Sequence, residues 1–248
     1  MKLFNALLLV FLLTTTNVQA QGIFDAFKRL FGTGTSSTST SNTISGLTTA
    51  EISQGLKEAL QLGVEDGVKK LGVTDGYFKN EMVKILLPEK LQTVDRTLRS
   101  MGLGSLADEG LKLLNRAAED AVTESIPIFT NAITSITFDD AKNILLGDKN
   151  AATSYLQKKT TEQLVTAFKP KIEASLGKVG ADKVWTNLIS RYNTFTRNDI
   201  TTDLNAYVTE QAISGVFKMV AEKETGIRDN VAERTSSILE KVFGSVKK

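Results

Sequence analysis

Residues 48–72, TTAEISQGLKEALQLGVEDGVKKLG, decide the fold class of this chain. Thr48 and Glu51 have the spacing of a capping box, in which each side chain accepts a hydrogen bond from the other residue's backbone amide. Apolar residues then recur every three or four positions, and Gly72 is a typical residue at the end of a helix. The stretch therefore predicts an amphipathic helix whose apolar face contains Ile52, Leu56, Leu60, Val64, Val68 and Leu71.

The same periodicity recurs through most of the remaining chain. Pro88 opens a second helix that runs to Gly102, a third follows Ser105, and Pro127 breaks or restarts that third helix. No run of alternating β-branched residues is long enough to indicate a strand. The sequence thus predicts an all-α fold, a single bundle-like domain of about eight helices. The later helices are expected over residues 137–147, 150–159, 161–176, 181–192, 203–224 and 231–243.

The first 46 residues have a different composition. Lys2, an apolar run and the small residues before Gln21 are typical of an export signal, so we expect residues 1–20 to be removed after Ala20. Residues 32–46 are rich in Ser, Thr and Gly and predict a flexible linker before a helical domain at 47–244. Between them, residues 21–31 predict a short amphipathic helix with the apolar residues Ile23, Phe24, Phe27, Leu30 and Phe31. These side chains either make weak contact with a membrane surface or pack back on the domain.

Composition excludes several classes of function. The chain has 30 basic and 28 acidic residues, and this near balance argues against nucleic acid as a partner. It has no Cys, so neither a disulfide nor a thiol nucleophile is available, and no His, the commonest proton carrier near neutral pH. Without either residue a transition-metal site is hard to build. We therefore expect no metal, no cofactor and no catalytic constellation.

Six ordered blocks of sequence together resemble a bacterial family known as domain of unknown function 4197, over roughly residues 47–244. The resemblance implies a helical, exported bacterial protein, which would place the chain in the periplasm or the cell envelope. It implies no activity, since the family has none assigned. The blocks are GLKEAL (55–60), LLPEKL (86–91), NRAAEDAV (115–122), DDAKNILLGDKNAATSYL (139–156), DLNAYVTEQAISGVF (203–217) and ERTSSILEKVFG (233–244).

One candidate site is the polar group Asn115, Arg116 and Glu119, which lies on a helix otherwise made of Leu and Ala. A buried charge needs a partner, so this group predicts a network with another helix. The alternative is a ligand or anion site built on Arg116. Both interpretations require that at least one of these side chains faces a packed surface.

Three further places carry candidate residues. Asp140, beside Asp139, is best explained as a capping residue, although paired carboxylates also serve acid-base chemistry. The polar turn before Thr153 and Tyr155 leads into a helix start whose free amides attract anions; the alternative is an ordinary capped helix. Arg228 and Arg234 lie near acidic residues and predict either an Arg-lined pocket or paired charges at helix ends.

These observations favour a non-enzymatic module that binds a ligand or a protein. Its partner would be a small molecule, a lipid or a protein, and its polar anchors would come from the candidate residues. One alternative is a His-independent hydrolase or lyase that uses carboxylate, Tyr and Arg side chains. Another is a structural protein of the membrane surface. The candidate binding residues are Asn115, Arg116, Glu119, Asp140, Thr153, Tyr155, Arg228 and Arg234.

Overall fold

The computed structural model describes residues 46–197 and 203–246. The all-α prediction is confirmed for this part of the chain, whereas the predicted signal, amphipathic helix and linker lie outside it, apart from Gly46. The α-helices are α2 (Thr49–Leu71), α3 (Glu89–Ser100), α4 (Gly104–Ala121), α5 (Ser125–Thr134), α6 (Phe138–Leu146), α7 (Ala151–Val179), α8 (Ala181–Thr196), α9 (Leu204–Asp229) and α10 (Ser237–Gly244). Two 3-10 helices, η1 (Val122–Glu124) and η2 (Val231–Glu233), join them.

Helix α2 follows its sequence pattern closely. The amide of Glu51 donates to Thr48 Oγ1 at 3.2 Å, and the amide of Thr48 donates to a Glu51 carboxylate oxygen at 2.8 Å, which completes the capping box. The helix ends where the Gly72 amide donates to the carbonyl of Val68 at 2.8 Å. All six predicted apolar positions are buried.

Glycines along α2 let its neighbours come close. A Cβ atom on Gly55 would lie 2.7 Å from Val242 Cγ2 of α10, and one on Gly67 would lie 3.1 Å from Met219 Cβ of α9. These distances are shorter than ordinary van der Waals contact. The α2 backbone therefore packs directly against side chains of α9 and α10.

Three helix boundaries differ from expectation. Residues 150–176 were expected to form two helices, but α7 is continuous over 29 residues with Pro170 inside it. No residue near the expected break stops a helix, and the Thr160 and Thr161 hydroxyls donate to carbonyls four residues back within the same helix. Helix α9 continues five residues past Glu224 to Asp229. Only the 3-10 helix η2 forms at Val231, because Asn230 Oδ1 accepts from the amide of Ala232; α10 begins later.

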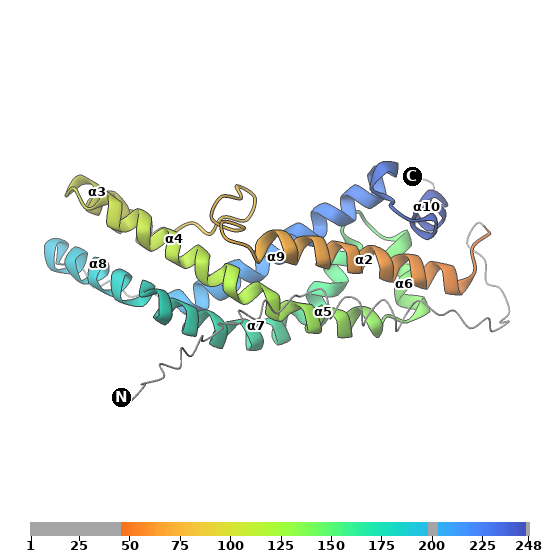
Figure 1. Cartoon of the computed structure of the whole chain (residues 1–248), viewed down its shortest axis with the longest axis horizontal. Helices are drawn as coiled ribbons and strands as arrows, with labels where there is room; N and C mark the ends of the chain where they lie inside the picture. The colour runs from red at the N-terminus through yellow and green to blue at the C-terminus, as the bar shows by residue number, and fades with distance from the viewer. Residues whose placement is uncertain (1–45, 198–202, 247–248) are drawn as a thin grey trace, which may run out of the picture. The chain divides into compact units, whose positions relative to one another are not determined.

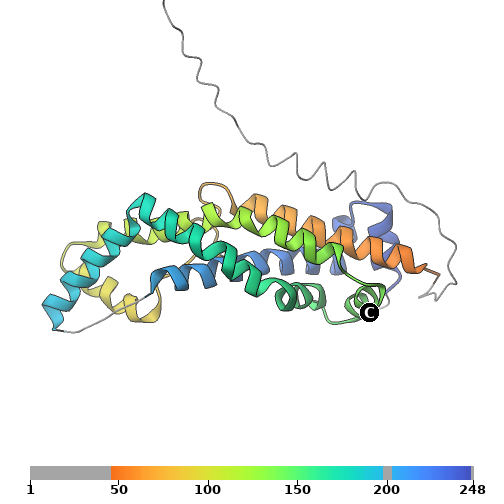
Figure 2. The ribbon, with the colours of Figure 1, turned by 90° about the horizontal axis from the view of Figure 1, so that it is seen from below.

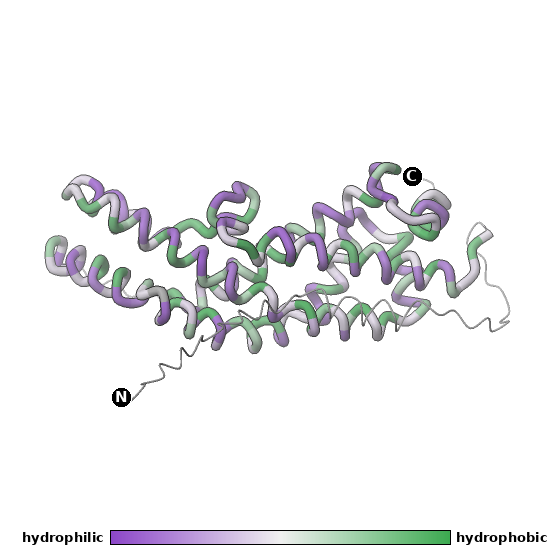
Figure 3. The backbone as a smooth tube through the Cα atoms, viewed as in Figure 1, coloured by the Kyte–Doolittle hydropathy of each residue, from purple (hydrophilic) through white to green (hydrophobic). Residues whose placement is uncertain are grey.

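The helices are arranged around α2, α4, α7 and α9, which pack against one another in pairs. Figures 1 and 2 show α3, the first part of α4 and α8 together at one end, and α6 and α10 at the other. Figure 3 shows hydrophobic and hydrophilic residues interleaved along each helix, as amphipathic packing requires. None of the described helices is both long and apolar enough to span a bilayer.

Candidate functional site

Glu119 of α4 holds the irregular connection between α2 and α3, residues 72–88. One carboxylate oxygen accepts from the amides of Tyr77 at 3.0 Å and Phe78 at 3.2 Å, and the other accepts from the amide of Asp75 at 3.2 Å. Arg116 pairs with Glu119 and with the Asp75 carboxylate, each at 2.5 Å. Glu119 is only 4% exposed. The structure therefore places Arg116 and Glu119 in a closed network between α4 and this connection.

Asn115 fixes the second half of the same connection. Its side-chain oxygen accepts from the Ile85 amide at 2.8 Å, and its nitrogen donates to the carbonyls of Ile85 and Leu111, both at 2.9 Å. The Tyr77 hydroxyl donates to the carbonyl of Ala212 in α9 at 2.7 Å. Burial raises the pKa of Tyr77 far above its usual range, so this hydroxyl stays a neutral donor. The connection is thus fixed from both α4 and α9.

Despite this fixed backbone, the connection exposes large apolar side chains. Val73 is 55% exposed, Met82 46% and Leu86 58%. The carbonyls of the last two are themselves hydrogen bonded to α9, at 2.8 Å between Leu86 and the Tyr207 hydroxyl and 3.3 Å between Met82 and the Lys218 amine. Their backbone is therefore held while their side chains face solvent.

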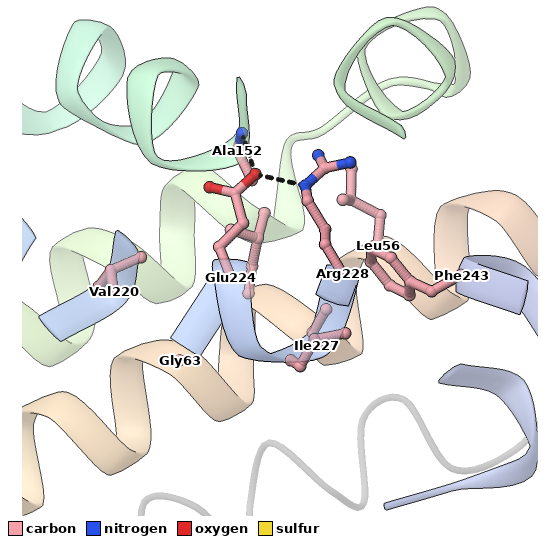
Figure 4. A pocket seen from close by; sticks show the side chains of 10 residues that line it. Leu56, Gly63, Ala152, Val220, Glu224, Ile227, Arg228 and Phe243 are labelled. Carbon is pink, nitrogen blue, oxygen red and sulfur yellow. Dashed lines mark hydrogen bonds and ion pairs between the residues drawn. The ribbon is translucent and has the colours of Figure 1, made fainter. Parts of the chain in front are cut away.

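The start of α7 attracts an anion, as its free amides predict, and the chain supplies that anion itself. The buried Glu224 of α9 accepts from the amides of Ala152 at 2.9 Å and Thr153 at 2.8 Å, and from the Thr153 hydroxyl at 2.8 Å. Arg228 Nε donates to the same carboxylate at 3.0 Å. Figure 4 shows Glu224 between Ala152 and Arg228. The sequence analysis did not select Glu224, although its i, i+4 spacing to Arg228 is a signal that could have found this pair.

The two candidate arginines serve different helix ends. Arg228 also donates to the carbonyls of Ile144 at 2.8 Å and Leu145 at 3.2 Å, at the end of α6. Arg234 donates to the carbonyls of Ile227 at 2.9 Å and Arg228 at 3.0 Å, at the end of α9. Cations at these positions satisfy carbonyls that have no partner within their helix and match the helix dipole. The structure does not bring Arg228 and Arg234 together as the lining of one pocket.

Asp140 is the acidic member of a second capping box. Its side chain accepts from the amide of Thr137 at 3.1 Å, and its own amide donates to Thr137 Oγ1 at 3.2 Å. Hydrogen bonds from the Thr137 hydroxyl and amide lower the pKa of Asp140. The Tyr155 hydroxyl lies 3.5 Å from the same carboxylate, and burial, aided by Asp140, raises the pKa of Tyr155. Asp140 therefore stays an anion beside the neutral phenol of Tyr155. Among the described residues, this pair shares no hydrogen-bond partner with Glu119.

A small cavity lies beside the Glu224–Arg228 ion pair, between α2, α9 and α10 (Figure 4). Its volume is about 10 Å³, which is room for one water molecule. Phe243 of α10 lines it, and the Arg228 guanidinium lies 5.9 Å from the centre of the Phe243 ring. The other walls are mostly aliphatic and include Leu56, Leu60, Val220 and Ile227.

The described residues also lack any group of three or more acidic, His or Cys side chains that could hold a metal ion. No curated protein and no solved structure matches the chain. The model of one family, described as "Protein of unknown function (DUF4197)", matches residues 46–244, which covers every helix described above. The chain therefore belongs to this family of helical proteins of unknown function.

Proposed function

We propose that the protein is an exported, non-enzymatic interaction module that binds a protein partner through the surface of the connection 72–88. The observation that carries the proposal is the contrast within this connection. Its backbone is fixed by the buried side chains of Glu119 and Asn115 in α4, and its Tyr77 hydroxyl donates to the backbone of α9. The connection nevertheless exposes Val73, Met82 and Leu86 to solvent. Long irregular connections that are held in this way are usually functional.

A fixed backbone favours binding through preorganisation. A loop whose backbone is already fixed loses little conformational entropy when it binds, so exposed apolar side chains on it contribute more to affinity. Lys79, Glu81 and Lys84 lie among the apolar residues in the sequence. A mixture of exposed apolar and charged side chains is typical of a protein interface rather than of a membrane-inserting loop.

The contacts of the candidate polar residues also support binding through the outer surface. Glu119, Glu224 and Arg228 are each engaged by partners within the chain. The cavity beside Arg228 has room for one water molecule, so the closed conformation does not admit an organic ligand there. Binding through the outer surface is therefore the function that the geometry supports best.

Site-specific photo-crosslinking tests the proposed surface. A benzophenone amino acid is placed at Met82 or Leu86 in bacterial cells, and at Val165 of α7 as the matched control, since Val165 is also an exposed apolar residue, 40% accessible. We expect one protein adduct from the two positions in the connection and none from Val165. The adduct protein is then purified, and the Met82→Ser and Leu86→Ser changes should each weaken its binding about tenfold or more. The same adducts from all three positions would contradict the proposal.

Export is supported by the pattern of residues 1–20 and needs its own test. Mass spectrometry of the protein from the periplasmic or envelope fraction should show an N-terminus at Gln21. A variant in which the apolar run of residues 6–13 is interrupted by Lys should stay in the cytoplasm with Met1 or Lys2 at its start. Recovery of the unprocessed wild-type chain in the cytoplasm would contradict the export proposal.

A further inference from the structure

The cavity beside Arg228 is lined on one side by Phe243 of α10, the shortest α-helix of the described residues. α10 follows the non-helical residues 234–236 and buries three large apolar side chains, Leu239, Val242 and Phe243. Its surface tie is the ion pair of Lys241 with Glu51, in which the Lys side chain is about half exposed. The free energy from burying three such side chains is of the same order as the conformational entropy that eight ordered residues lose. Local opening of α10 therefore costs little compared with global unfolding.

Opening α10 would enlarge the cavity by the volume of the Phe243 ring. The walls that remain are aliphatic side chains of α2 and α9, with Ala152 of α7, and they end at the Glu224–Arg228 pair. The closed molecule thus already contains an apolar pocket, and Phe243 acts as its internal occupant. Well-formed apolar pockets with a few convergent polar groups are typical of small-molecule sites.

The contacts of Arg228 determine which kind of ligand the pocket can bind. The N–H groups of the guanidinium donate to Glu224 and to the carbonyls of Ile144 and Leu145, and its central carbon lies over the Phe243 ring, 5.9 Å from the ring centre. An aromatic ring at this place gains a cation–π interaction that an aliphatic group of the same size does not. A carboxylate would instead meet Glu224 and two carbonyl oxygens, so an anionic ligand is disfavoured.

We propose that α10 is a displaceable plug and that the pocket beneath it binds a small uncharged aromatic molecule in place of the Phe243 ring. This site is built from other residues than the connection 72–88, so each proposal can fail without the other. Because the pocket is available only while α10 is open, the apparent affinity of the ligand equals its intrinsic affinity multiplied by the open fraction. Any change that loosens α10 without altering the pocket must therefore tighten binding.

The test is a titration of the mature chain with 4-methylphenol, followed by the NMR signals of the methyl groups that line the pocket. In the wild type we expect saturable shifts of Leu56, Leu60, Val220 and Ile227. 4-Methylcyclohexanol has the same heavy atoms but no aromatic ring, and 4-methylbenzoate is anionic. Each should bind at least about fivefold more weakly, because the first loses the cation–π contact and the second is repelled by the oxygen atoms around Arg228.

Three variants separate the plug from an ordinary surface effect. Lys241→Gln removes the tie to Glu51 and keeps the lining, and it should tighten binding of 4-methylphenol up to about fivefold. Lys149→Gln removes a comparable exposed ion pair, with Asp229, outside α10 and should change nothing. Phe243→Ala should tighten binding about tenfold or more, provided that circular dichroism shows a folded protein. If the Phe243→Ala variant is unfolded, the effect of Lys241→Gln on binding alone tests the proposal.

Three results would overturn the proposal. One is the absence of saturable shifts in both the wild type and Lys241→Gln. A second is binding to Phe243→Ala alone, which would show an engineered hole rather than a plug that opens. The third is equal binding of 4-methylcyclohexanol and 4-methylphenol, which would show that the Arg228 guanidinium does not select an aromatic ring.

Discussion

Glu119 and Glu224 are buried carboxylates that complete sites made by other parts of the chain. Each accepts from backbone amides of a distant segment and pairs with an Arg three or four residues away on its own helix. The two sites resemble anion-binding sites, with amide donors and a guanidinium around one carboxylate. The chain fills them with its own side chains, which explains how these polar residues contribute to the fold.

The Glu119→Gln change should destabilise the protein by about 3–5 kcal/mol, because it leaves the partly buried Arg116 with one fewer carboxylate and turns an acceptor into a donor near three amides. Urea denaturation followed by circular dichroism measures the loss. Glu109→Gln, at an exposed position of the same helix, is the matched control and should change the free energy of unfolding by less than about 0.5 kcal/mol. Equal effects of the two changes would show that Glu119 is not held as described.

Glu51 gives a pH-dependent contribution to stability. Hydrogen bonds from Lys241 and Thr48 lower the pKa of this carboxyl from its usual 4.5 to about 2. The contribution is fully present above pH 4.5, and it is lost as the pH falls through the interval down to about 2. The group is close to solvent, so we expect less than about 1 kcal/mol.

The check is the difference in urea midpoint between the wild type and Glu51→Gln. This difference should be constant above pH 5 and should shrink toward zero near pH 2, while the effects of other carboxyls cancel between the two proteins. A difference that does not change with pH would contradict the lowered pKa of Glu51.

Among the elements, helix interiors follow the sequence better than helix ends do. The apolar stripe and capping box of α2 were visible in residues 48–72, because both depend on residues within a turn of each other. The continuity of α7 was missed, since nothing local distinguishes a short polar stretch within a helix from a break between two helices. The roles of glycines inside helices also depend on packing that the local sequence does not show. Gly55 and Gly177 both lie inside helices, but only Gly55 has a neighbouring side chain close to the position of a Cβ atom.

Substitution of these two glycines by Ala should have opposite effects. Gly55→Ala would bring its Cβ against Val242 of α10 and should destabilise the protein by about 1–3 kcal/mol. A Cβ on Gly177 has no atom within 4 Å, so Gly177→Ala should stabilise it by about 0.5–1 kcal/mol through helix propensity. Thermal unfolding measures both. If both substitutions raised the melting temperature, the close approach of α2 and α10 would be wrong.

At the scale of the whole molecule, the family match and the described helices cover nearly the same part of the chain. We therefore expect the fragment 46–246 to unfold cooperatively, with a melting temperature within a few degrees of that of the longer fragment 21–248. Calorimetry of both proteins measures this. A fragment that starts at residue 56 loses the buried residues Leu47 and Ile52 together with the α2 capping box, and it should not fold. A melting temperature of the fragment 46–246 far below that of the longer fragment would show that residues before 46 are part of the domain.

The sequence by itself determined the fold class, the apolar stripe and capping box of α2, and several of the polar residues that hold the helices together, although it missed Glu224. Asn115, Arg116, Glu119, Thr153 and Arg228 were all found as candidates because they interrupt apolar stripes or occupy helix ends. Their partners came only from the tertiary structure. Asn115 binds Ile85, 30 residues away, and Glu224 binds Ala152, 72 residues away. Periodicity and caps act over a few residues, so they carry no information on which segments meet. That meeting gave Glu119 and Glu224 their partners within the chain, fixed the connection 72–88, and brought the Arg228 guanidinium over the Phe243 ring.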